Sequence, residues 1–220
     1  VLWGRSLYLN IQRFILFQLT INVAAVGIAL LGPFLGVELP LTVIQMLWIN
    51  LIMDTLAALA LATEPPNAEV MRHSPRDPEA FIVTPYMAWN IFGTAAFFIL
   101  CFIGFVTYCS SRGISMENNV EMLTILFTSF VLLQFWNLLN VKCFGSYRSI
   151  FSRLTENPTY WLIALGILVG QVLIVQFCGG FFRTVPLTLG QWIGIVAGTS
   201  VVLWAGELYR LIRRLTGGKN

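Results

Sequence analysis

The sequence contains little charge. Only 10% of its 220 residues are Asp, Glu, Lys or Arg, against about 25% in an ordinary soluble domain. Hydrophobic residues make up 57% of the chain, so there are too few polar side chains to cover its surface in water. The composition therefore argues against a soluble enzyme, a nucleic-acid-binding protein and a disordered tail, and it predicts an integral membrane protein.

Metal-binding motifs of the zinc type are absent. The single histidine is His73, and no two of the four cysteines form a CxxC pair. The cysteines are Cys101, Cys109, Cys143 and Cys178. Because no histidine lies near them in sequence, we expect ordinary thiols and no zinc site, and we expect His73 to be solvated.

ATP-handling motifs are absent as well. The chain contains neither a GxxxxGK[ST] loop nor the DKTGT stretch that is used for aspartyl phosphorylation. We therefore expect no catalytic residue, no cofactor-binding residue and no ATPase activity in this chain alone. The N-terminal stretch VLWGRSLYLNIQRF lacks the regions of a signal peptide and starts abruptly, which we interpret as a piece of a longer chain.

What the sequence does contain is long apolar runs. A membrane-spanning helix needs about 20 apolar residues, and six windows bounded by charge, Gly and Pro have about that length. These windows cover residues 13–32, 41–63, 87–109, 121–141, 159–177 and 189–209. No linker divides the chain, so we predict an all-α integral membrane protein with one six-helix transmembrane bundle over residues 1–220.

The basic residues are distributed asymmetrically. Eleven of the thirteen Lys and Arg lie in the two terminal segments and in loops 64–86 and 142–158. The opposite loops carry only Arg112 and Arg183. Since cytoplasmic loops carry the excess of Lys and Arg, we expect both termini to be cytoplasmic.

Glycine repeats predict close helix packing. Gly166 and Gly170 form one GxxxG motif, and Gly190, Gly194 and Gly198 extend a second one. Small residues at this spacing let helix backbones approach each other in membranes. We expect these glycines to belong to the scaffold rather than to a transport site.

One carboxylate lies in the middle of a span. The other nine acids occupy loops or helix ends, and Glu207 can pair there with Arg210. Asp54, in WINLIMDTLAALAL, has no such explanation, and a charged group in the bilayer centre costs about 2.5–3.5 kcal/mol. Asn50 precedes it by four residues, so we expect both side chains on one helical face. An amide and a carboxylate are oxygen ligands for a hard cation, which needs six to eight oxygens.

Other polar groups are available to complete such a site. Asn22 lies in the first span, and Gln134, Asn137 and Asn140 recur every third residue in the fourth. We keep Asn22 and Gln134 as candidate supporting residues. For the stripe in the fourth span, the favoured interpretation is interhelical hydrogen bonding. A protonated Asp54 that bonds to a neighbouring helix remains an alternative for the second span.

Several stretches resemble a known family. QMLWINLIMDTLAALALATEPP closely resembles the sixth transmembrane helix of P-type Ca²⁺-ATPases. GRSLYLNIQRFILFQLTINVAAV resembles the end of the phosphorylation-domain hinge and the fifth helix, FVLLQFWNLLN the eighth, and IVQFCGG with LTLGQWIG the junction of the ninth and tenth. The resemblance covers nearly the entire chain in order. It implies helices five to ten, the C-terminal half of a P-type ATPase membrane domain.

The resemblance implies that Asn50 and Asp54 bind a transported Ca²⁺. Two-ion pumps of the sarcoplasmic-reticulum type have further ligands: a Glu on the fifth helix, a Thr just before the sixth-helix Asp, and a Glu on the eighth. The matching positions are Ala25, Met53 and Gln134. These are poor ligands for a hard cation. The pattern is similar to that of plasma-membrane-type pumps and implies one Ca²⁺ per cycle.

The resemblance also implies what acts outside this chain. ATP and Mg²⁺ would serve only the intact protein, whose N-terminal part holds the phosphorylated Asp, the nucleotide domain, the actuator and the fourth helix with its PEGL-type Glu. A proton would return as Ca²⁺ leaves, the lipid bilayer would be a partner and nucleic acid would not, and the location would be the plasma (inner) membrane. Two alternatives stay open. One is a non-enzymatic regulator or assembly partner derived from a pump gene, and the other is a pump for Mn²⁺ or another divalent cation.

Overall fold

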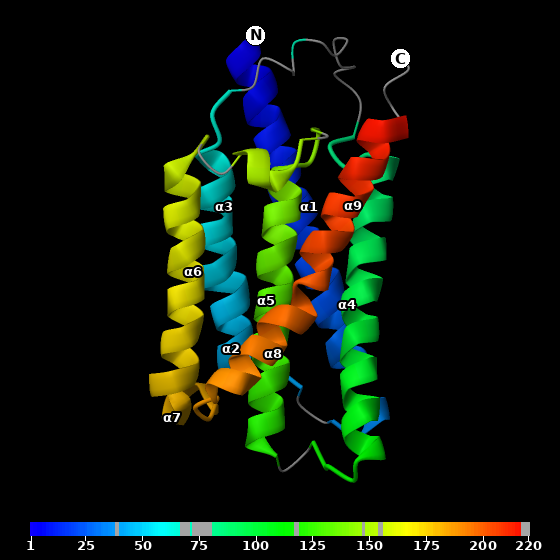
Figure 1. The fold of residues 1–220 in the computed structure, drawn as a ribbon, viewed down its shortest axis with the longest axis vertical. Helices are drawn as coiled ribbons and strands as arrows, with labels where there is room; N and C mark the ends of the chain where they lie inside the picture. Colours follow the sequence, from blue (N-terminus) through cyan, green and yellow to red (C-terminus); the bar gives the residue numbers. More distant parts are fainter. Residues whose placement is uncertain are drawn as a thin grey trace.

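The computed structural model describes residues 1–37, 40–66, 71, 81–116, 119–146, 148–153 and 156–216. Within these ranges every regular element is a helix, and six helical segments are long and apolar enough to cross a membrane (Figure 1). The segments are Leu2–Leu31, Val43–Ala62, Pro85–Ser111, Val120–Lys142, Pro158–Phe177 and Leu189–Thr216. The predicted all-α, six-helix membrane bundle is therefore confirmed.

Four spans are single helices and two are composite. The single helices are α1 (Leu2–Leu31), α4 (Pro85–Ser111), α5 (Val120–Lys142) and α6 (Pro158–Phe177). The second span consists of α2 (Val43–Leu47), the π-helical segment η2 (Trp48–Met53) and α3 (Asp54–Ala62). The sixth span consists of α8 (Leu189–Thr199) and α9 (Val201–Thr216). Short helices η1 (Pro33–Leu35), η4 (Ile150–Arg153) and α7 (Gly179–Phe182) lie in the connections.

Side-chain caps determine where several spans begin. The Thr84 hydroxyl accepts a hydrogen bond from the Met87 N–H at 3.2 Å, and Pro85 is the first residue of α4. Asn157 caps α6 in the same way and is followed by Pro158. Proline fits the first helical position because the N–H that it lacks has no partner there anyway. Both starts lie within two residues of the predicted ones.

The first and last spans are longer than predicted. α1 begins at Leu2 instead of residue 13, and α9 continues to Thr216 instead of residue 209. The predicted windows followed hydropathy, which stops where charge begins, whereas a helix continues until its backbone is interrupted. No proline interrupts either extension. At 30 residues, α1 is about 45 Å long, which exceeds the hydrocarbon core of about 30 Å.

α5 lies at the centre of the bundle (Figure 1). It packs against α1, α4, α6, α8 and α9, and α3 packs against α1 and α6. Phe127 and Leu138 of α5 are fully buried, as are Phe17 and Ile21 of α1. A helix that is apolar on all sides is suited to this central position. α1 and α6 therefore each pack against both α5 and α3, the helix that carries Asp54.

The two terminal helix ends lie at the same end of the bundle. Figure 1 shows the start of α1 and the end of α9 there, together with the connection after α5. The connections between α4 and α5 and between α6 and α8 lie at the other end. Part of the basic set, Arg72, Arg76 and Lys219, lies outside the described residues, as does His73. The assignment of this end to the cytoplasm remains a prediction.

The glycine repeats bring helices together at only one position. A Cβ on Gly170 would lie 2.8 Å from the Trp48 ring, so this glycine makes room for the indole. At Gly166, Gly190, Gly194 and Gly198 a Cβ would meet no atom within 4 Å among the described residues. The prediction of close packing is therefore wrong for these four, because a small side chain permits a close approach but does not supply a neighbour.

Candidate functional site

Asp54 is buried in the middle of the second span. It is the first residue of α3, directly after the π-helical segment η2, and its side chain is only 5% exposed. Its Oδ1 atom has no hydrogen-bond partner among the described residues. A buried carboxylate oxygen without a partner is costly. This atom is therefore the strongest indication of a ligand or a proton in the span.

The backbone next to Asp54 departs from the α-helix. The Asp54 N–H bonds to the carbonyl of Ile49, five residues back. The side chains of Ile49 and Asp54 are buried, while those of Asn50 and Thr55 are exposed. Asn50 and Asp54 thus differ in exposure, and their joint role as ligands of one ion stays a prediction.

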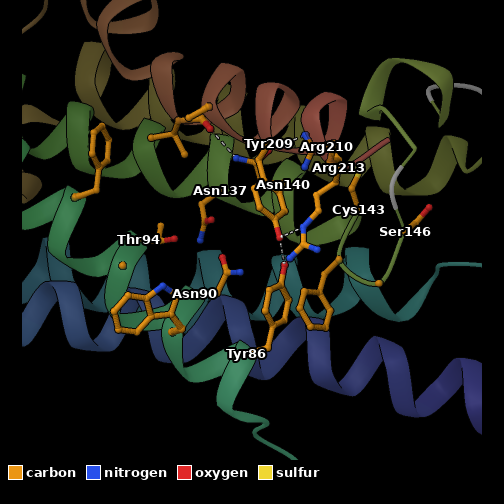
Figure 2. Close-up of a pocket in the computed structure, with 18 residues that line it drawn as sticks. Tyr86, Asn90, Thr94, Asn137, Asn140, Cys143, Ser146, Tyr209, Arg210 and Arg213 are labelled. Atoms are coloured by element: carbon orange, nitrogen blue, oxygen red, sulfur yellow. Dashed lines mark hydrogen bonds between the residues drawn. The ribbon is translucent and has the colours of Figure 1, made fainter. Parts of the chain in front are cut away.

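In the polar stripe of α5, which consists of Gln134, Asn137 and Asn140, some amide groups have hydrogen-bond partners and others do not. Asn140 donates to the Val202 carbonyl at 2.8 Å and accepts from Arg210 at 3.0 Å, so its predicted interhelical bonding is confirmed (Figure 2). Gln134 is fully buried, and neither of its amide atoms has a partner among the described residues. The Asn137 Nδ2 atom also lacks one. The hydrogen-bonding interpretation is therefore wrong for Gln134 within the described part of the chain.

Two of the remaining site positions carry buried apolar side chains. Met53 is fully buried and Ala25 is 5% exposed. Asn22 is half-buried on α1, the helix that packs against α3. No group of three His, Cys, Asp or Glu residues that could hold a metal occurs in the described ranges. Ca²⁺ takes six to eight oxygens, and the predicted ligands Asn50 and Asp54 would supply only part of such a set.

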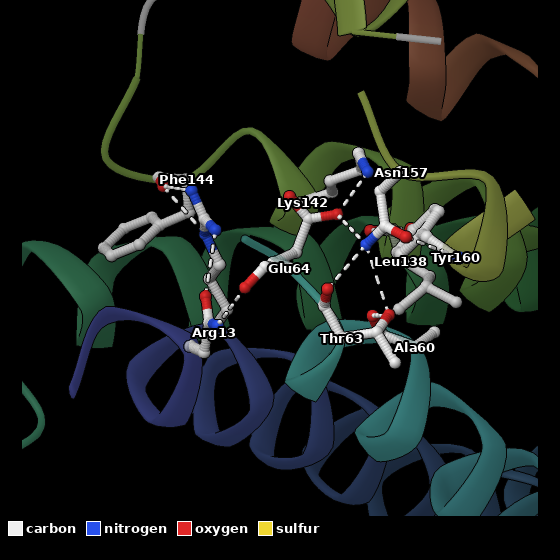
Figure 3. A network of polar contacts seen from close by, with 10 residues as sticks. Arg13, Ala60, Thr63, Glu64, Leu138, Lys142, Phe144, Asn157 and Tyr160 are labelled. Carbon is white, nitrogen blue, oxygen red and sulfur yellow. Dashed lines mark hydrogen bonds and ion pairs between the residues drawn. The ribbon is translucent and has the colours of Figure 1, made fainter. Parts of the chain in front are cut away.

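A second polar cluster lies at the bundle end that holds the termini (Figure 3). Glu64, just past α3, forms an ion pair with Lys142, the last residue of α5, and their side chains are 1% and 0% exposed. The Asn157 Nδ2 atom donates to the Thr63 carbonyl at 3.0 Å and to the Glu64 carboxylate at 3.2 Å. The Tyr160 hydroxyl donates to the Leu138 carbonyl at 3.2 Å. These contacts join the ends of α3 and α5 to the start of α6.

Arg13 extends this cluster to α1. Its Nε and Nη2 atoms donate to the Phe144 carbonyl at 3.1 and 3.0 Å, and its Nη1 atom donates to Asn10 at 3.2 Å. The Asn10 amide in turn donates to the Glu64 carbonyl at 3.3 Å. Buried charges that are paired and hydrogen-bonded in this way stabilise one arrangement of the helices only if all partners remain.

From sequence alone, these charges are expected in loops or at helix ends. Lys142 belongs to loop 142–158 with the basic residues that orient the chain, and Glu64 to the acids in loops or at helix ends. One signal was available: Glu64 directly follows an apolar span and directly precedes Pro65 and Pro66, so it has little chain with which to leave the bundle. The predicted pair of Glu207 and Arg210 is confirmed, with 2.7 Å between their charged atoms.

The comparisons with known proteins agree with the fold. A family model described as "Cation transporting ATPase, C-terminus" matches residues 38–212. The chain is 38% identical to human plasma membrane calcium-transporting ATPase 3 over 213 residues, covering 93% of this chain and 18% of the relative. It is 39% identical to mouse plasma membrane calcium-transporting ATPase 1 over 221 residues (96% and 18%) and 37% identical to Caenorhabditis elegans plasma membrane calcium-transporting ATPase mca-1 over 213 residues (93% and 17%). The chain thus spans less than a fifth of the length of these curated relatives. Since the family match extends over most of its residues, the chain belongs to the cation-transporting ATPase C-terminal family.

Proposed function

We propose that this chain is the C-terminal membrane part of an ATP-driven Ca²⁺ export pump of the plasma membrane. In this proposal Asp54 is a ligand of the transported ion. The carrying observation is the buried Asp54 Oδ1 atom without a partner, directly after a π-helical turn. Single π-helical turns within α-helices occur frequently at functional sites. The names of the similar proteins, which are calcium-transporting ATPases, support Ca²⁺ as the cargo.

The surroundings of Asp54 favour a single ion. Two positions at which the resemblance to two-ion pumps implies further ligands carry a buried methyl group, Ala25, and a buried thioether, Met53. Neither coordinates a hard cation well. Gln134 offers one neutral amide oxygen on α5, and this amide is fully buried. One Ca²⁺ per cycle is therefore the stoichiometry that these residues support.

The rest of the coordination shell would come from the remainder of the intact protein. Asn50, Leu51 and Thr55 form an exposed face on the second span. A polar Asn50 facing lipid at this depth is unfavourable, so this face is suited to being covered by another helix. Such a helix would bring further oxygens toward the η2 turn and allow Asn50 and Asp54 to share the ion.

Transport then follows an alternating-access cycle. ATP and Mg²⁺ would act in the part of the intact protein beyond this chain, where an Asp is phosphorylated. The resulting movement would open the site around Asp54 first to one side of the membrane and then to the other. When Ca²⁺ leaves, a proton taken up by the Asp54 carboxyl would neutralise a charge that the apolar surroundings disfavour. This proton would be the counter-transported ion.

The test is Asp54→Asn in the full-length pump. We expect Ca²⁺ to activate phosphorylation by ATP much less than in the wild type, because the amide supplies one oxygen and no charge to bind the ion. The matched control is Glu121→Gln, which makes the same change at an exposed position at the start of α5 and is expected to behave like the wild type. Unchanged Ca²⁺-dependent phosphorylation in Asp54→Asn, with an unfolding temperature equal to that of the wild type, would contradict the assignment.

The same assay distinguishes the cations. Parallel titrations with Ca²⁺ and Mn²⁺ use the full-length wild-type pump and Asn50→Ala. We expect activation at lower concentrations of Ca²⁺ than of Mn²⁺, and a weaker response to Ca²⁺ in Asn50→Ala. Stronger activation by Mn²⁺ would identify Mn²⁺ as the transported ion and would leave the assignment of the site unchanged. An unchanged Ca²⁺ response in Asn50→Ala would remove Asn50 from the ligand set.

A further inference from the structure

The first half of the second span is hydrogen-bonded to α6 and α7. The Trp48 Nε1 atom donates to the Gln171 Oε1 atom of α6 at 3.1 Å. The Gln45 Nε2 atom donates to the Phe182 carbonyl of α7 at 3.0 Å. α2 and α7 lie in contact toward the end of the bundle opposite the termini (Figure 1). Because Trp48 is the first residue of η2, its bond to Gln171 holds the π-helical segment at the point where it begins.

The contact between Trp48 and Gln171 is tightly enclosed. Gln171 is 1% exposed and Trp48 is 9% exposed, and Gly170 leaves the space that the indole ring occupies. An indole N–H can only donate, so it orients the amide of Gln171 with the oxygen toward Trp48. The Gln171 Nε2 atom is left without a partner among the described residues. An unpaired buried donor calls for an explanation, and holding the indole in place supplies one.

The second half of the same span is held by the other end of α6. Asn157, which caps α6, donates from its Nδ2 atom to the Thr63 carbonyl at 3.0 Å and to the Glu64 carboxylate at 3.2 Å. The second span is therefore attached to α6 at two points, one on each side of η2. Trp48 and Gln171 form the first point of attachment, and Thr63 and Asn157 form the second.

The two helices have unequal numbers of residues between these points. Thr63 follows Trp48 by 15 positions, whereas Gln171 follows Asn157 by 14. If both segments were regular α-helices, the one in the second span would be about 1.5 Å longer than its partner in α6. A π-helical turn closes its hydrogen bond over five residues instead of four and so accommodates one extra residue. The wide turn is therefore favoured as long as both attachments persist.

We propose that Gln171 is a positioning residue of the ion site. Through Trp48 it holds η2 in the wide turn that leaves the buried Asp54 Oδ1 atom available to a ligand. The inference rests on the proposed function, in which Asp54 binds the transported ion. Without this attachment the second span is free to adopt regular α-helical bonding. The fraction of pump with the binding-competent turn then falls, and the apparent affinity for Ca²⁺ falls by the same factor.

The experiment uses the full-length pump and measures phosphorylation by ATP as a function of Ca²⁺ concentration. Gln171→Leu removes the acceptor of the indole bond. Its matched control is Gln176→Leu, the same change on α6, which breaks instead a 2.8 Å bond to the Leu187 carbonyl. The double variant Trp48→Phe/Gln171→Leu removes both partners of the indole bond.

A glycine pair on α6 tests the same contact without removing a polar group. Gly170→Ala places a Cβ 2.8 Å from the Trp48 ring, whereas Gly166→Ala places one in open space. Both changes improve helix propensity, so an effect confined to Gly170→Ala reports on the position of the indole.

We expect Gln171→Leu to raise the half-activating Ca²⁺ concentration about tenfold, which corresponds to about 1.4 kcal/mol, with the maximal level of phosphorylation unchanged. Gly170→Ala should shift it in the same direction. The double variant should shift it less than Gln171→Leu, because no buried indole N–H is left unpaired. Both controls should behave like the wild type. A lower unfolding temperature or maximal level with an unchanged half-activating concentration would show a merely structural role and overturn the proposal, as would an equal shift in Gln176→Leu.

Hydrogen exchange separates this inference from the assignment of the ion. The exchange of the backbone N–H groups of residues 48–54 is measured in the full-length pump without Ca²⁺. We expect faster exchange in Gln171→Leu than in the wild type and in Gln176→Leu. Unchanged exchange would overturn the positioning role even if Asp54→Asn confirmed the ligand. Faster exchange, together with a Ca²⁺ response that Asp54→Asn leaves intact, would support the hold of Gln171 on η2 and contradict the proposed function alone.

Discussion

Lys142 and Glu64 form an ion pair in which both charged side chains are buried, although 78 residues separate them in sequence. The Lys142 ammonium also lies 3.9 Å from the centroid of the Tyr160 ring. The pair joins the end of the second span to the end of the central helix α5. The span that carries Asp54 is therefore anchored at this end by charge, while its middle contains the π-helical turn.

Removing one member of this pair should destabilise the bundle strongly. We expect Glu64→Gln to lower the free energy of unfolding by about 3–5 kcal/mol, because Lys142 would remain buried without a counter-charge. The amide still offers an oxygen to Asn157, so the loss reports mainly on the charge. Thermal unfolding of the purified intact protein measures the effect.

The double variant Glu64→Gln/Lys142→Met provides the control for that prediction. It removes both charges, so it should be more stable than Glu64→Gln alone. Equal stability of the single and double variants would show that the two charges do not depend on each other.

Asn157 should be sensitive to a substitution that an N-cap ordinarily tolerates. Its oxygen caps α6 through the Tyr160 N–H, and its amide group donates to Thr63 and Glu64. Asp caps helices as well as Asn does, but Asn157→Asp would lose the three bonds that its amide donates and place a second carboxylate beside Glu64. We expect Asn157→Asp to be at least as destabilising as Asn157→Ala.

The matched comparison for Asn157 is Asn119→Asp. Asn119 also caps a helix, α5, through the Met122 N–H, and we expect little change in unfolding temperature there. If Asn157→Asp proved as stable as the wild type, the helix cap would be the stabilising role of Asn157, and its donated hydrogen bonds in the polar cluster would not contribute to the free energy of unfolding.

The bundle could be predicted because its signals are local. Apolar length identified six spans, and the pairs Thr84-Pro85 and Asn157-Pro158 identified two helix starts within two residues. Paired charges could not be predicted in the same way. The contact between Glu64 and Lys142 depends on how three helices meet, and hydropathy treats each charge as if it faced water.

The candidate site was predicted in part for a related reason. Asp54 stood out because a carboxylate in mid-span needs a local explanation. The exposure of Asn50 beside a buried Asp54 could not be predicted from periodicity, and WINLIM contains neither Gly nor Pro to indicate an irregular turn. The π-helical hydrogen bond from Asp54 to Ile49 is therefore a property of the packed structure that periodicity does not reveal.

Gly206 should be the glycine whose substitution matters most for the packing of α9 on α5. A Cβ there would lie 2.1 Å from the Asn140 side-chain oxygen, which also accepts the bond from Arg210. We expect Gly206→Ala to cost about 1–3 kcal/mol through overpacking. Gly198→Ala, with open space around it, should be neutral or stabilising by up to about 1 kcal/mol. Equal unfolding temperatures for the two variants would contradict this packing.

The two ends of the α5 polar stripe should respond in opposite directions to the same substitution. Asn140→Leu removes a bond to the Val202 carbonyl and one from Arg210, and it should destabilise the protein by about 1–3 kcal/mol. Gln134→Leu removes an amide with no partner among the described residues, so its unfolding temperature should be unchanged or higher. Ca²⁺ transport measured on the same samples distinguishes an effect on stability from an effect on transport. A stable Gln134→Leu pump with impaired Ca²⁺ transport would assign Gln134 to the ion path, whereas a destabilised one would show that its amide is hydrogen-bonded in the intact protein.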